Sequence, residues 1–243
     1  MLPFFNIGPF AIPAKPFVII LGIYAALWLI ERAIDELELE PEWLRATAFN
    51  AIGIGLVGGR LVFALTHWEA TIANPFSVIW PITIGYSLWG SILSGLLFFL
   101  YATAKRNVNL LQLLDSISPS LLVLIGAWTI GDFLGGPGFG TPANLPLFTR
   151  HPVQLYELCV VILAFAGWSL SRPQKTFDGW LFLITTALLA AGMLLAFRFR
   201  GDSITVFAGW RLNQIIAFIT LIFALSSLTL WSPKGSQESL TSS

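Results

Sequence analysis

Charged residues are scarce in this sequence, since Asp, Glu, Lys and Arg make up only 11% of its 243 residues. A soluble domain carries about 25% charged residues. A disordered chain is rich in charged residues and poor in apolar ones. The composition therefore excludes a water-soluble enzyme and a disordered protein. Thirteen basic residues balance thirteen acidic ones, so no net positive charge is present to attract nucleic acid.

Cysteine is almost absent as well. The single Cys159 excludes an internal disulfide and a cysteine-based zinc cluster. Apolar residues, in contrast, make up 56% of the chain and include ten Trp and twenty Phe, giving a mean hydropathy of +0.79. Aromatic side chains are typical of the membrane–water interface, which points to a membrane protein.

Seven apolar runs approach the length of about 20 residues that a membrane-spanning helix needs. They are Pro16–Ile30, Ala46–Leu65, Ile82–Thr103, Leu110–Ile130, Val153–Leu170, Trp180–Phe197 and Leu212–Trp231. The runs predict an all-α polytopic membrane protein. We expect residues 1–231 to form a single transmembrane domain, followed by a polar, disordered tail over residues 232–243.

The basic residues of the connecting segments give a weak preference for one orientation. With the amino terminus outside and the carboxyl terminus in the cytoplasm, seven basic residues lie on the inner side and five on the outer side. The outer five are Lys15, Arg150, Arg198, Arg200 and Arg211. We interpret their clustering around two outer loops as a hint of function.

The polar residues of the spans converge on the predicted outer leaflet. They are Arg60, Asp132, Gln154, Glu157 and Gln214. Charged groups in spans usually face a cavity or a partner, and the planar fork of arginine matches phosphate. The pattern predicts a cavity for an anionic lipid headgroup. Two other interpretations stay open: the terminal arginines extend to headgroups without binding them specifically, and Arg60 forms a structural pair with Asp132 or Glu157.

Glycine is concentrated in two places. Gly55 and Gly59 in the second run, with Ser91 and Gly95 in the third, predict close helix packing. The stretch 131–140 contains five Gly and a Pro, and we expect it to be an irregular loop beside the cavity rather than helix. His151 follows this loop and is either structural or a proton carrier.

Several segments resemble the prolipoprotein diacylglyceryl transferase family. The segment 150–157, Arg-His-Pro-Val-Gln-Leu-Tyr-Glu, is similar to the family's RHPSQLYE motif. Gly58-Gly59-Arg60 resembles its GGR segment, residues 126–140 resemble its glycine-rich stretch, and residues 210–217 resemble its last helix. The order and the approximate spacing agree over nearly the whole chain.

The resemblance implies a multi-pass enzyme of the bacterial inner membrane. Such an enzyme moves diacylglycerol from phosphatidylglycerol to the lipobox cysteine of a prolipoprotein, without a metal or cofactor. On this interpretation His151 or Glu157 accepts the thiol proton, and Arg200 acts with them on the phosphate. The substrate-binding residues would be Arg60, Asp132, Gly140, Arg150, Gln154, Tyr156, Arg198 and Gln214.

The chain also departs from the family pattern. Trp89 stands where the family has a histidine, Thr129 where it has an arginine, and Asp132 where it has an asparagine. Losing a cation and gaining a carboxylate makes a site less favourable for phosphate.

Two alternatives to the transferase therefore stay open. One is a catalytically degenerate relative that binds an anionic phospholipid or serves as an assembly subunit with partners in a membrane complex. The other is a small transporter or channel, which would also place polar groups at mid-membrane. The sequence contains no detectable internal repeat to support it.

Overall fold

A computed structural model of the chain describes residues 3–8, 10–33, 40–73, 85–136, 140–144, 149–207 and 209–231. The chain divides into two compact units. The first combines residues 1–29 with residues 114–243, and the second contains residues 30–113. The predicted tail over residues 232–243 lies outside the described residues.

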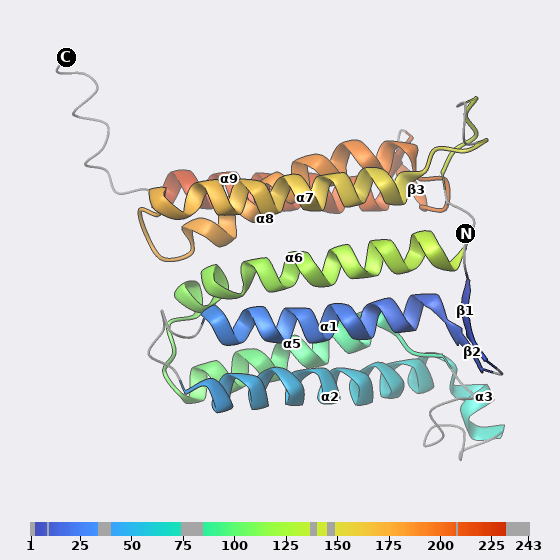
Figure 1. Cartoon of the computed structure of the whole chain (residues 1–243), viewed down its shortest axis with the longest axis horizontal. Helices are drawn as coiled ribbons and strands as arrows, with labels where there is room; N and C mark the ends of the chain where they lie inside the picture. The colour runs from blue at the N-terminus through green and yellow to red at the C-terminus, as the bar shows by residue number, and fades with distance from the viewer. Residues whose placement is uncertain are drawn as a thin grey trace. The chain divides into compact units, whose positions relative to one another are not determined.

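Among the described residues, seven helices are long and apolar enough to cross a membrane (Figure 1). They are α1 (Ala14–Ala33), α2 (Pro41–Thr66), α5 (Leu88–Lys105), α6 (Leu110–Gly135), α7 (Val153–Ser171), α8 (Trp180–Ala196) and α9 (Leu212–Trp231). This confirms the predicted all-α class and the seven spans. The orientation of the termini stays a prediction.

Two predicted boundaries differ from the structure. Helix α6 continues through Gly131 and Asp132 to Gly135, so the prediction of an irregular loop from residue 131 was wrong. Glycine weakens a helix by about 1 kcal/mol without breaking it, and packing against α1 at Gly131 offsets that cost. The third run was predicted to begin at Ile82, whereas helix α5 begins at Leu88. The Ser87 hydroxyl caps this helix by accepting a hydrogen bond from the Gly90 N–H at 3.2 Å.

The second unit is built on the pairing of α2 with α5 (Figure 1). The short helix α3 (Trp68–Ala73) follows α2 in the chain. Small residues allow this close approach. A Cβ on Gly55 would press against the Ser91 carbonyl oxygen, and one on Gly59 would overlap the Ser91 hydroxyl. A Cβ on Gly95 would press against the Ala51 carbonyl oxygen. The predicted close packing at these residues is therefore confirmed.

The first unit contains α7, α8 and α9 packed side by side, and α1 alongside the later part of α6 (Figure 1). Its core includes a cluster of Leu122, Val161, Ala164 and Met193. Two short antiparallel hairpins complete it. Strands β1 (Phe4–Ile7) and β2 (Phe10–Pro13) precede α1, and β3 (Thr205–Phe207) and β4 (Trp210–Arg211) precede α9. The short helices η2 (Arg172–Gln174) and η3 (Phe197–Phe199) follow α7 and α8.

Asp115, near the start of α6, holds the beginning of α8 in place. Its carboxylate accepts hydrogen bonds from the backbone N–H groups of Gly179 and Phe182, both at 2.9 Å. The Lys175 ammonium lies 3.1 Å from the same carboxylate and 3.1 Å from that of Asp178. Burial alone would lower the pKa of Lys175, but its hydrogen bonds to these two carboxylates raise it above the ordinary value. Asp115 therefore satisfies the unpaired donors of the α8 amino terminus.

Replacing Asp115 by Asn is expected to lower the free energy of unfolding by about 3 kcal/mol, because the two N–H groups at the start of α8 lose their charged acceptor and Lys175 loses one of its two carboxylates. A thermal melt in detergent measures the loss. Asp178→Asn is the matched control, since Asp178 contacts the same lysine but its side chain is 42% exposed. Equal melting temperatures for the two variants would contradict this account of Asp115.

Candidate functional site

The predicted site residues that belong to the first unit lie at the end of its helices where α7 begins and α8 ends. There, residues 140–144 form isolated bridges between Gly140 and Arg200 and between Pro142 and Arg150. The Thr141 N–H donates to the Phe199 carbonyl at 2.8 Å, and the His151 N–H donates to the Thr141 carbonyl at 3.0 Å. These backbone bonds join the start of α7 to the segment after α8, and thereby bring the sequence-distant side chains of the site together.

Gly140 has a steric reason to be glycine. A Cβ at this position would overlap the carbonyl oxygen of His151, and the Arg150 guanidinium donates to the Gly140 carbonyl at 3.3 Å. The sequence predicted a substrate-binding role for Gly140. What the structure gives it is a close backbone approach that sets the position of His151.

Gly140→Ala is expected to destabilise the protein by about 2 kcal/mol, because the backbone carrying His151 must move away. Gly136→Ala serves as control, since a Cβ there meets nothing within 4 Å. Melting temperatures of the two variants in detergent test this. Indistinguishable values would show that the backbone at Gly140 moves without cost.

Arg200 lies at the centre of an ion-pair cluster. Its guanidinium donates to Glu157 Oε1 at 2.8 Å and to the two Asp202 oxygens at 2.8 and 3.2 Å. Glu157 is only 6% exposed. Burial alone would lower the pKa of Arg200, but the hydrogen bonds and charges of Asp202 and Glu157 raise it above the ordinary value. The guanidinium is therefore charged and fixed in position.

His151 lies within an aromatic group beside this cluster. Its Nδ1 lies 3.2 Å from the Tyr156 hydroxyl. Its ring lies 4.6 Å from that of Phe199, measured between centroids. These contacts fix the orientation of the imidazole while leaving its side chain partly exposed. His151 and Tyr156 were predicted from the sequence, whereas Phe199 was missed because apolar residues are common everywhere in this chain.

Three further predicted residues have distinct surroundings. Gln154 is 4% exposed, and its side-chain oxygen has no hydrogen-bond partner among the described residues. The Gln214 side-chain oxygen accepts from the Arg211 N–H at 3.3 Å, which is the geometry of a helix cap at the start of α9. Arg198 is exposed. Gln154 thus offers a buried acceptor for a ligand, while Gln214 has a structural contact.

Arg60 belongs to the second unit, where it is 7% exposed. Its guanidinium donates to the Gly85 carbonyl at 3.2 Å and lies 5.1 Å from the Tyr86 ring centroid. The predicted role of Arg60 in headgroup binding stays a prediction.

Sequence reasoning assigned no role to Lys15, at the start of α1. Its ammonium lies 2.6 Å from Asp132 Oδ1 and 4.4 Å from the centroid of the Trp128 ring. A Cβ on Gly126 of α6 would lie 3.5 Å from Val161 of α7. Asp132 and Glu157 lie further toward the end of α6 and the start of α7, so the Lys15–Asp132 pair belongs to the same end of the unit as Arg200. The sequence placed Lys15 among the outer basic residues, which was the available signal. It did not indicate its partner Asp132, which lies 117 residues further along the chain.

The three departures from the family pattern have different surroundings. Thr129 is 3% exposed, and its hydroxyl donates to the Ile125 carbonyl at 2.9 Å. The hydrogen-bonding need of this buried hydroxyl is therefore met within α6. Trp89 lies in the second unit with 71% of its surface exposed. The Asp132 carboxylate is compensated by Lys15.

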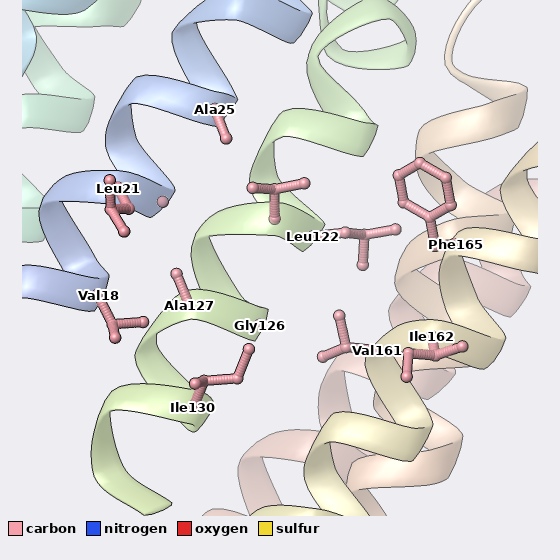
Figure 2. A pocket seen from close by; sticks show the side chains of 12 residues that line it. Val18, Leu21, Ala25, Leu122, Gly126, Ala127, Ile130, Val161, Ile162 and Phe165 are labelled. Carbon is pink, nitrogen blue, oxygen red and sulfur yellow. The ribbon is translucent and has the colours of Figure 1, made fainter. Parts of the chain in front are cut away.

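An apolar groove of about 390 Å³ runs between α1, α6 and α7 (Figure 2). It is lined by Val18, Leu21, Gly22, Ala25, Leu122, Val123, Gly126, Ala127, Ile130, Val161, Ile162 and Phe165. The groove continues from the polar end along the same helix faces. Val18 lies three residues after Lys15 and Val161 lies four after Glu157, which are the spacings of neighbours on one helix face.

Comparison with known proteins gives a consistent result. A family model described as prolipoprotein diacylglyceryl transferase matches residues 3–230. The chain is similar to proteins named phosphatidylglycerol–prolipoprotein diacylglyceryl transferase from several organisms. The protein of Mycobacteroides abscessus is 27% identical, over 97% of this chain and 78% of its own length. That of Clostridium tetani is 26% identical, over 86% and 88% respectively. That of Enterococcus faecalis is 25% identical, over 89% and 86%.

The family match covers all seven apolar helices. The family match and the seven apolar helices together identify a multi-pass membrane protein. The chain belongs to the prolipoprotein diacylglyceryl transferase family.

Proposed function

We propose that this protein transfers the diacylglyceryl group of phosphatidylglycerol to the lipobox cysteine of prolipoproteins in a bacterial cytoplasmic membrane. The single observation that carries the proposal is the fixed Arg200–Glu157 pair, in which Arg200 directly follows Phe199, whose ring packs against His151, in a chain of this family. A fixed cation and a potential proton acceptor are the two groups that the reaction requires.

The combination of a polar end and an apolar groove suits a phospholipid. The groove is lined by carbon-rich side chains and lies directly beyond Lys15 and Glu157 on the same helix faces. A headgroup among the ion pairs would allow one acyl chain to lie in the groove. The buried, unpaired oxygen of Gln154 would accept a hydrogen bond from a hydroxyl of the glycerol headgroup.

The reaction exchanges one bond for another. The cysteine sulfur attacks the glyceryl carbon that carries the phosphate, a carbon–sulfur bond forms, and the carbon–oxygen bond to the phosphate breaks. Glycerol phosphate leaves. The thiol must lose its proton because the thiolate is the nucleophile, and that proton is returned to solvent or to the leaving phosphate.

His151 is the proton acceptor that the geometry favours. In the tautomer that donates its Nδ1–H to the Tyr156 hydroxyl, which lies 3.2 Å away, the other ring nitrogen is an acceptor. Glu157 already accepts from Arg200, so its role is to orient that guanidinium. Arg200 stabilises the charge that develops on the departing phosphate. No metal or cofactor is required for these steps.

Complementation tests the proposal in cells. The gene is expressed in a strain depleted of its own transferase, together with a reporter prolipoprotein whose mass is measured. We expect growth to be restored and the reporter to carry a diacylglyceryl group. An unmodified reporter, with this protein demonstrably inserted in the membrane, would exclude the transferase and favour a lipid-binding relative without turnover.

A further inference from the structure

The Arg200 guanidinium alone is poorly suited to bind a phosphate. Glu157 and Asp202 both accept hydrogen bonds from it at 2.8 Å, so two carboxylates already compensate its charge. An incoming phosphate would have to compete with both. The site therefore requires a second cation whose charge is less fully compensated.

Lys15 meets this requirement. Among the residues that the structure describes, one carboxylate oxygen, on Asp132, lies 2.6 Å from its ammonium, and an ammonium has three N–H donors. The Lys15 side chain is 38% exposed, whereas that of Asp132 is only 13% exposed. The lysine is thus open to a ligand while its partner is turned inward.

The surroundings of Lys15 hold it in place. Its ammonium lies over the Trp128 ring at 4.4 Å, a favourable contact for a cation. A Cβ added to Gly131 would lie 3.2 Å from the Lys15 Cγ, so the glycine leaves room for the lysine stem. Trp128, Gly131 and Asp132 lie within two turns of α6, and together they position one ammonium at the end of the unit that carries the Glu157–Arg200 pair.

We propose that Lys15 is the second cation of the headgroup site and that its ammonium binds the phosphate of the phospholipid, with Asp132 and Trp128 as its positioning residues. This inference rests on the proposed transferase function. It assigns a ligand contact to Lys15 and gives Asp132 a role through the lysine rather than on the lipid. The resulting arrangement places a phosphate between a lysine on α1 and an arginine after α8.

The test compares Lys15→Gln, Lys15→Arg and the double variant Lys15→Gln/Asp132→Asn. The KM for phosphatidylglycerol is expected to rise about tenfold in Lys15→Gln, the effect of losing one charged hydrogen bond. Its kcat should stay within about twofold, and Lys15→Arg should retain near-normal KM. Lys105→Gln, at the exposed end of α5, is the control for general loss of positive charge.

The double variant separates binding from neutralisation. If Lys15 binds phosphate, KM stays high when Asp132 is also neutralised, because the ammonium is still missing. If Lys15 only compensates Asp132, the double variant recovers the wild-type KM, and the proposal is overturned. Unchanged KM in Lys15→Gln overturns it as well.

Direct binding keeps this test independent of turnover. Short-chain phosphatidylglycerol in detergent micelles is titrated into each purified variant, with inorganic phosphate as a separate probe. We expect Lys15→Gln to weaken lipid binding about tenfold and inorganic phosphate to compete poorly with the lipid. A wild-type protein that binds the lipid without transferring it would contradict the proposed function alone. Lipid binding that is indifferent to Lys15 would contradict this inference alone.

Discussion

Arg200→Lys is expected to reduce kcat/KM for diacylglyceryl transfer about a thousandfold, the loss typical of removing a key stabiliser of transition-state charge. Arg200 uses three of its nitrogens to contact Glu157 and Asp202. A lysine ammonium is a point charge that cannot reproduce this planar, two-sided geometry. The variant therefore keeps the charge of Arg200 and loses its orientation. Transfer to a lipobox peptide, followed by mass spectrometry, measures the effect.

Arg172→Lys is the matched control for this substitution. Arg172 lies in η2, beyond the other end of α7, where it is exposed and its guanidinium stands 5.2 Å from the centroid of the Trp168 ring. We expect the control to keep activity within about twofold, as for most surface substitutions. An Arg200→Lys enzyme as active as this control would show that charge without geometry is sufficient.

His151→Gln is expected to lower kcat about a hundredfold, because a general base contributes on this scale. Glutamine keeps a polar side chain of similar reach near Tyr156 but cannot accept the thiol proton. The KM for phosphatidylglycerol should change little, since the phosphate contacts are made by other residues. Steady-state kinetics with a fluorescent lipobox peptide separate the two parameters.

The other histidine provides the control for this change. His67 lies in the second unit, where its ring stacks on Phe63 with 4.1 Å between centroids. His67→Gln should leave kcat within about twofold. If His151→Gln also retained full kcat, the proton would have to pass to a different acceptor, and Glu157→Gln would be the next variant to measure.

The spans were predictable because their signal is local. Long apolar runs with few charges are rare outside membranes, and α9 begins and ends at the residues that the sequence indicated, Leu212 and Trp231. The end of α6 was misjudged because glycine was counted as a helix breaker. At Gly131 the absent Cβ instead makes room for Lys15. This close packing depends on α1, which is distant in the sequence.

The chemistry-bearing residues were predictable and their pairing was not. The motif around His151 and Glu157 named residues of the site, but the structural partner considered for Glu157 was Arg60. The structure pairs Glu157 with Arg200, across 43 residues of sequence. Similarly, only the fold brings Asp115 to the α8 amino terminus, where its carboxylate accepts from the Gly179 N–H. Such pairs depend on tertiary packing, which no local pattern encodes.

The most direct measurement uses the purified protein with phosphatidylglycerol and a lipobox peptide carrying one cysteine. We expect a peptide with a diacylglyceryl thioether and one glycerol phosphate released for each peptide modified. A peptide with a cysteine-to-serine change should gain nothing. Bound phosphatidylglycerol that is never consumed, in protein that is folded and supplied with peptide, would contradict the account.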